Sequence, residues 1–115
     1  MVAIKKKKTD QSLKGQTWKL TDLVHYQQDV IVSRELVQRK SGSVTIFAFD
    51  RGQRLSEHSA PFDALIQDLE GEAEVTIAGK AHNLHPGEMI ILPANKPHGL
   101  KALTRFKMVL IMVKS

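Results

Sequence analysis

The sequence contains no cysteine, few aromatic residues and no long hydrophobic run. Without cysteine the chain forms no disulfide and offers no thiolate for catalysis. No apolar run approaches the ~18 residues of a membrane-spanning helix, so we expect no contact with a membrane. The first apolar residues are followed by four lysines at positions 5–8 and not by an apolar stretch, which is not the pattern of a signal peptide. These absences favour a cytoplasmic location.

The scarcity of aromatic residues also bears on nucleic-acid binding. The 115-residue chain carries 17 Lys and Arg against 12 Asp and Glu, a net charge of +5, and only 5% of its residues are aromatic. Removing the lysines at 5–8 leaves +1. A nucleic-acid surface would combine a basic face with aromatic side chains on the folded part. We therefore expect no nucleic-acid partner.

Familiar catalytic patterns are missing as well. The sequence has no glycine-rich nucleotide loop, and it supports no Ser-His-Asp or paired-carboxylate arrangement. A chain of this length forms one domain with one core. Residues 1–15 are expected to be a disordered basic tail, and residues 16–115 the folded domain.

The residues that are present predict an all-β domain. Short segments rich in β-branched or alternating apolar residues are separated by turn signals, at 30–37, 44–49, 64–69, 72–77, 89–92 and 105–113. Strands of this length and spacing are typical of a β-sandwich or barrel. Segment 105–113 is apolar on both faces except for Lys107, which predicts burial of both faces. Segments 30–37 and 105–113 together have more apolar surface than one small core needs.

One histidine lies in a motif of recognisable spacing. Gly52 is followed after five residues by His58, and then come Ala60, Ala64 and Gly71. This spacing is similar to that of the first motif of the cupin family: G, five residues, HxH, three or four residues, E, six residues, G. Alanine stands at the second His and at the Glu (Leu65 in the longer register).

A second histidine completes the resemblance. Gly87 is followed after five residues by Pro93, Asn95 and His98. The second cupin motif reads G, five residues, PxG, two residues, H; Asn95 departs from it, and Ala102 replaces a final Asn. The resemblance covers roughly residues 36–113. It implies a small RmlC-like conserved-barrel protein of the cupin 2 type, folded as a double-stranded β-helix or jelly roll, and it implies a homodimer.

The resemblance also implies a metal site, because cupins hold a divalent Zn, Ni, Mn or Fe ion with three His and one Glu. Here only His58 and His98 match that set, as metal ligands and as candidate catalytic residues. Two protein ligands fall short of the usual three, so any metal is expected to bind weakly. Three alternatives stay open: hydrogen-bonded pocket histidines, an incomplete metal site, and a metal-free pair that binds or acts on a ligand.

Alanine at two ligand positions leaves room for a small molecule. The expected pocket is apolar, with Phe62 as a lid. Its predicted lining is Phe47, Phe49, Phe62, Val75, Ile77, Met89, Ile91 and Met108. The alternatives are ordinary core packing for the set and a loop anchor for Phe62. The leading hypothesis is a small-molecule-binding cupin with a degraded metal site. Its rivals are a metal-dependent oxygenase-like or isomerase-like enzyme and a structural or interaction module.

Overall fold

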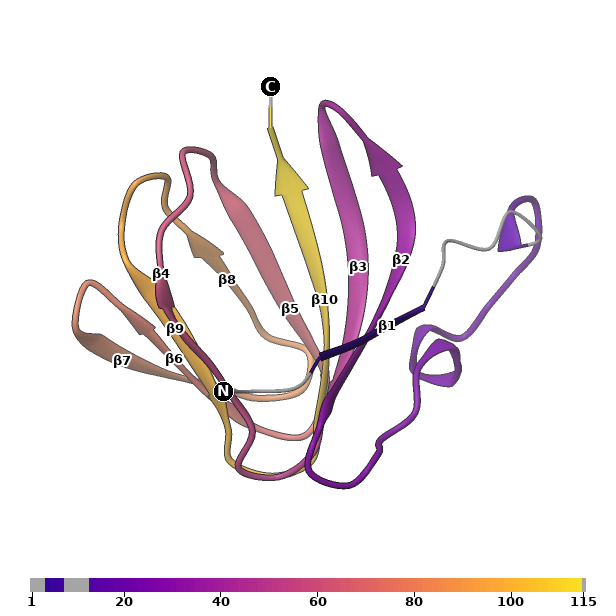
Figure 1. Ribbon diagram of the computed structural model, residues 1–115, viewed down its shortest axis with the longest axis horizontal. Coiled ribbons are helices and arrows are strands. Elements are labelled where there is room, and N and C mark those ends of the chain that lie inside the picture. The colour runs from indigo at the N-terminus through magenta and orange to yellow at the C-terminus, as the bar shows by residue number, and fades with distance from the viewer. Residues whose placement is uncertain (1–3, 8–12, 115) are drawn as a thin grey trace.

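The computed structural model describes residues 4–7 and 13–114, and nearly all of its regular structure is β (Figure 1). The elements are β1 (Ile4–Lys7), the 3₁₀ helix η2 (Leu20–Leu23), β2 (Ile31–Arg39), β3 (Gly42–Phe49), β4 (Arg54–His58), β5 (Ala64–Glu70), β6 (Ala73–Ile77), β7 (Lys80–Leu84), β8 (Met89–Leu92), β9 (His98–Ala102) and β10 (Phe106–Val113). A six-stranded sheet in the order β1-β2-β3-β10-β5-β8 faces a four-stranded sheet in the order β4-β9-β6-β7. The predicted jelly-roll fold is confirmed.

The core between the sheets follows from the alternation of side chains along each strand. Phe106 and Met108 of β10 point inward, and the ring of Phe106 packs 5.6 Å from that of Phe49. On β6, Ala73 and Val75 are buried in the same core. The core therefore fills the closed end of the barrel, with its largest side chains from the central strands β3 and β10.

A second cluster covers part of the outer face of the larger sheet. Leu23 and Val24, from the segment before β2, pack on Val32, Ile46 and Ala48. This explains part of the apolar character of the outer face: the chain folds its own residues 13–30 over the sheet.

A charged residue of β10 is buried under this covering segment. The ammonium group of Lys107 donates to the Thr21 carbonyl at 2.7 Å and lies 4.9 Å from the centre of the Tyr26 ring. Lys107 interrupts the apolar outer positions of β10, and these two contacts satisfy its charge there.

The N-terminal region differs from the disordered tail that was expected. Residues 4–7 form β1, which pairs in parallel with β2 from Ile4 opposite Ile31 to Lys7 opposite Arg34. Backbone groups at the edge of β2 accept a further strand whatever its side chains are, so a run of lysines does not prevent pairing. Residues 13–15 begin a turn, and the remaining tail residues, 1–3 and 8–12, lie outside the described residues. No helix among those that are described is long and apolar enough to cross a membrane.

Gly71 offers a test of the turn between β5 and β6. Gly71 and Gly79 both have a positive φ, at 78° and 81°, but only at Gly71 would a Cβ clash, lying 1.9 Å from the Arg105 carbonyl oxygen. We expect Gly79→Ala to cost ~1–2 kcal/mol for its left-handed backbone alone. Gly71→Ala should lower the free energy of unfolding by a further ~1–3 kcal/mol, because its Cβ overlaps the Arg105 carbonyl oxygen. Urea unfolding measures both losses. Equal losses would show that the turn shifts freely.

Candidate functional site

The two motif histidines meet at the open end of the barrel. His58 is the last residue of β4 and His98 the first of β9, and the ladder between these strands places them opposite each other. Their ring centres lie 4.5 Å apart in an edge-to-face arrangement. His98 is buried, whereas His58 is exposed. The motif spacing therefore brings together two residues 40 positions apart, as the sequence predicts.

Backbone contacts fix which nitrogen of each ring carries the proton. Nδ1 of His58 lies 2.9 Å from the Ser56 carbonyl oxygen, and Nδ1 of His98 lies 3.1 Å from that of Lys96. A carbonyl only accepts, so each Nδ1–H is the donor. In the neutral ring Nε2 then keeps its lone pair. Each histidine thus has one acceptor nitrogen left for a ligand.

The surroundings of His98 keep it neutral. Burial lowers the pKa of His98 below its ordinary 6.5, and the neighbouring His58 lowers it further, while the hydrogen bond to Lys96 opposes the shift. At neutral pH the His98 ring is therefore uncharged, with Nε2 as an acceptor.

Both rings line a cavity of ≈ 80 Å³ that is otherwise mostly apolar. Its walls come from both sheets: Leu55, His58, Ala60, Phe62, Ala64, Ile66, Val75, Leu92, His98, Gly99, Leu100, Met108, Leu110 and Met112. The two alanines of the first motif are in this wall, so their small side chains leave space in it. A mostly apolar hollow with a few convergent polar atoms is the usual form of a small-molecule site.

Six of the eight residues predicted for the pocket lie in the barrel interior, but only three line the cavity. Phe62, Val75 and Met108 are in its wall. The other three belong to the core: Phe47 and Phe49 on β3, and Ile77 on β6, which lies opposite His98 in the ladder with β9. Phe49 is fully buried and its ring stands 6.0 Å from that of Phe47, so both fill the core.

The prediction for Met89 and Ile91 is wrong. Their side chains are 52% and 50% exposed on the outer face of β8, whereas Ile90 and Leu92 point inward. A strand of four consecutive apolar residues has no polar alternation to show which pair faces inward. A shift of one residue exchanges the two faces, and the ladder with β5 decides between them.

Several wall residues were not predicted. Leu110 and Met112 share a face with Met108 on β10, so the alternation of that strand carried the signal for both. Leu55 and Leu100 come from β4 and β9, whose exposed and buried positions give only a weak apolar pattern.

The donor atoms at the cavity do not fit the four-ligand metal centre of the family. Two imidazoles are present, and alanine occupies both remaining ligand positions. Asp63, next to Ala64, accepts the Ala94 backbone N–H at 2.8 Å and is not part of the cavity wall. Among residues 4–7 and 13–114, no group of three His, Cys, Asp or Glu side chains is arranged to hold a metal ion.

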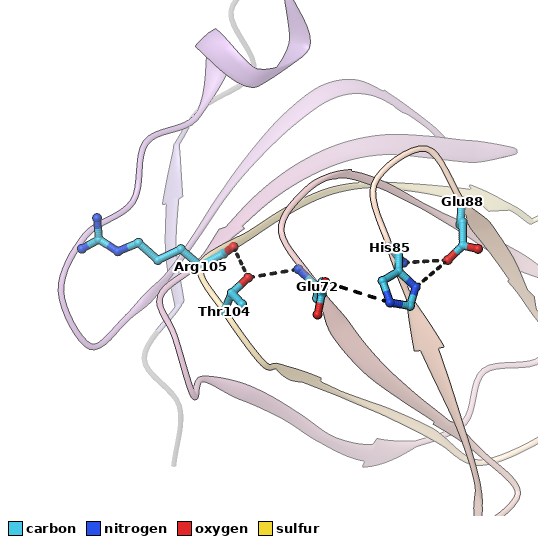
Figure 2. Close-up of polar contacts among 5 residues, drawn as sticks. All are labelled: Glu72, His85, Glu88, Thr104 and Arg105. Atoms are coloured by element: carbon cyan, nitrogen blue, oxygen red, sulfur yellow. Dashed lines mark hydrogen bonds and ion pairs between the residues drawn. The ribbon is translucent and has the colours of Figure 1, made fainter.

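A separate polar network links the turns at the other end of the barrel (Figure 2). Nδ1 of His85 lies 3.0 Å from a carboxylate oxygen of Glu88, and Nε2 lies 4.0 Å from one of Glu72. The Thr104 hydroxyl accepts the Glu72 N–H at 3.0 Å and donates to the Arg105 carbonyl at 2.8 Å. These residues are exposed, and their contacts tie the turns together.

Comparison with known proteins agrees with this architecture. Residues 45–114 match the sequence profile of the Cupin domain family. A conserved protein of unknown function from Streptococcus pyogenes is 40% identical, with a TM-score of 0.84 over 88% of this chain and 89% of its own. A cupin superfamily protein from Desulfitobacterium hafniense is 27% identical, with a TM-score of 0.84 over 89% and 94%.

A third solved structure shows how such a domain occurs in a longer chain. A cupin 2 conserved barrel domain protein from Leptotrichia buccalis is 41% identical, with a TM-score of 0.82 over 84% of this chain and 47% of its own. No curated protein matches the sequence. From the profile match and the two relatives of about 40% identity, this chain belongs to the cupin family.

Proposed function

We propose that this cupin binds a small, mainly apolar molecule that carries one hydrogen-bond donor, and that it does so without a tightly held metal. The observation that supports the proposal is the pairing of two acceptor nitrogens, Nε2 of His58 and Nε2 of His98, with an otherwise apolar cavity. A hydroxyl or N–H group of the ligand would donate to one of them, and the apolar body would lie among the side chains of both sheets.

The size of the cavity limits the ligand. A volume of ≈ 80 Å³ is below the ~150 Å³ of an apolar cavity that takes benzene. The exposed His58 leaves the mouth open, so part of a ligand would extend outside. One small ring or a short chain is therefore the class of compound to test.

The test compares two probes of the same shape, phenol and toluene, which differ in one hydroxyl group. We expect phenol to bind roughly 2- to 13-fold more tightly, because one hydrogen bond contributes ~0.5–1.5 kcal/mol. Chemical-shift titration of the ¹⁵N-labelled protein measures both dissociation constants. In the variant His58→Leu/His98→Leu, whose side chains are close to imidazole in size but accept no hydrogen bond, the preference should disappear, while toluene should still bind.

Glu57→Gln is the matched control, since Glu57 is exposed, adjoins His58 and is absent from the cavity wall. It should leave both constants unchanged. Equal affinity for phenol and toluene in the natural chain would contradict the role of the histidines, and failure of both probes to shift cavity resonances would contradict the binding site itself.

A further inference from the structure

A lysine lies at the rim of the barrel cavity, just beyond its apolar wall. The ladder between β10 and β5 ends with Met112 opposite Ala64, and both residues line the cavity. Two residues beyond Met112, the ammonium group of Lys114 lies 5.7 Å from the centre of the Phe62 ring, which is part of the same wall. The C-terminal end of β10 is on the same side of the barrel as the loop from β4 to β5 that carries Phe62 (Figure 1).

Backbone hydrogen bonds hold this end of the chain in place. The Val113 N–H donates to the Asp63 carbonyl at 3.3 Å, and the Lys114 N–H donates to the Ser41 carbonyl at 2.7 Å. The first bond reaches the loop before β5, and the second reaches the turn between β2 and β3. The backbone of Lys114 is thus fixed relative to the cavity, and its exposed side chain is the part that can meet a ligand.

The ammonium group of Lys114 has donors left for a ligand. Its contact with Phe62 is with a ring, which attracts the cation through its π electrons and offers no oxygen or nitrogen acceptor. Among the described residues, no ion pair involves Lys114. A lysine ammonium carries three N–H donors and no acceptor. This position at the rim therefore suits an anionic group.

The other charges around the mouth leave it positive. The two loops that meet there, 59–63 and 93–97, carry one acid and one base, Asp63 and Lys96. One carboxylate oxygen of Asp63 accepts a backbone N–H of the facing loop at 2.8 Å. Glu57, at the end of β4, lines a separate groove of the smaller sheet. With Lys114 added, the rim has one positive charge in excess.

We propose that the ligand of the barrel cavity is a small apolar acid, with its carboxylate at Lys114. This inference rests on the proposed binding function and adds the part of the ligand that lies outside the cavity. A hollow of ≈ 80 Å³ is too small to enclose one ring completely, so a polar end protrudes at the mouth. A donor at the inner end would meet Nε2 of His58 or His98, and the carboxylate at the outer end would accept from the Lys114 ammonium group.

The test compares 4-hydroxybenzoate with 4-hydroxybenzamide, which have the same shape but differ in charge at pH 7. Chemical-shift titration of the ¹⁵N-labelled protein at low salt measures both dissociation constants. We expect the carboxylate to bind about 2- to 5-fold more tightly than the amide, which is the usual range for an exposed ion pair. The difference should vanish in ~1 M NaCl, where the Debye length is ~3 Å.

Two variants of Lys114 separate its charge from its bulk. Lys114→Gln should bind the two compounds equally while its affinity for phenol stays unchanged, and Lys114→Arg should keep the preference for the carboxylate. Lys101→Gln is the matched control, because Lys101 is an exposed lysine on β9 that does not line the cavity. It removes the same charge from the chain and should keep the preference.

Three results would overturn the inference, each in a different way. Equal binding of 4-hydroxybenzoate and 4-hydroxybenzamide to the natural chain, with phenol still preferred over toluene, would remove the acid and leave the proposed function standing. Loss of the preference in Lys101→Gln as well would mean that the net charge of the whole chain attracts the carboxylate. If Lys114→Gln weakens phenol as much as 4-hydroxybenzoate, Lys114 only holds Phe62 in place.

Discussion

Asp68→Asn is expected to raise the free energy of unfolding at pH 8 by up to about 4 kcal/mol. Asp68 lies on β5 in the barrel interior with 1% of its surface exposed. Neither of its carboxylate oxygens has a hydrogen-bond partner among the described residues. Burial raises the pKa of Asp68 from 3.8 to about 7, and the nearby Glu70 backbone and then His85 oppose this shift. Each unit of such a shift corresponds to 1.36 kcal/mol.

The sign of the pH dependence follows from where the proton is bound. Below about pH 4 the Asp68 carboxyl is protonated in both the folded and the unfolded chain. It then carries no charge, and burying it does not lower the stability. Between about pH 4 and pH 7 the folded chain keeps the proton that the unfolded chain has lost, so stability falls as the pH rises. Above pH 7 the folded chain has also lost the proton, and the stability falls no further on account of Asp68. Asparagine has no charge to bury, so the variant should lack this part of the slope.

Urea unfolding at pH 4, 6 and 8, at one protein concentration, measures the effect. The difference between Asp68→Asn and the natural chain should be small at pH 4 and largest at pH 8. Asp22→Asn is the control, since Asp22 is an exposed aspartate on η2. A variant that is less stable than the natural chain at pH 8 would mean that the buried carboxylate has a favourable partner, such as water, which the amide does not replace.

The all-β class could be predicted from turn residues and from the alternation of apolar side chains, which set the strand boundaries. The meeting of the two histidines could be predicted from the resemblance of the segments around His58 and His98 to the two cupin motifs. Since β4 and β9 are neighbours in the fold, the two side chains had to converge.

The features that could not be predicted from the sequence depend on contacts between segments that lie far apart along the chain. The inward face of β8 is chosen by its ladder with β5, so Met89 and Ile91 were assigned to the wrong side. The pairing of residues 4–7 depends on a free edge of β2, which local composition does not show. The buried state of Asp68 follows from the fold around the turn at 86–88, where its backbone bonds to Gly87 and Glu88.

Restoring the two missing ligands is expected to raise divalent-metal affinity by orders of magnitude. In the variant Ala60→His/Ala64→Glu the added side chains start from the wall of the cavity that His58 and His98 already line. The change takes the site from two protein ligands to four and adds a negative charge that offsets the cation. The same side chains fill the space left by the alanines, so phenol should no longer bind.

Calorimetric titration with Zn, Ni, Mn and Fe(II) compares the natural chain with this variant. Ala60→Gln/Ala64→Gln is the control, because it adds similar bulk without the imidazole or the carboxylate, and it should block phenol without creating metal affinity. Nanomolar binding by the natural chain would reveal a ligand beyond His58 and His98 and would overturn the metal-free proposal. If Ala60→His/Ala64→Glu binds no better than its control, positions 60 and 64 do not present their side chains as the family's ligands do. Tight binding by Ala60→His/Ala64→Glu alone would mean that this barrel keeps the geometry of a metal centre. The natural chain would then lack tight metal binding only because alanine stands at positions 60 and 64.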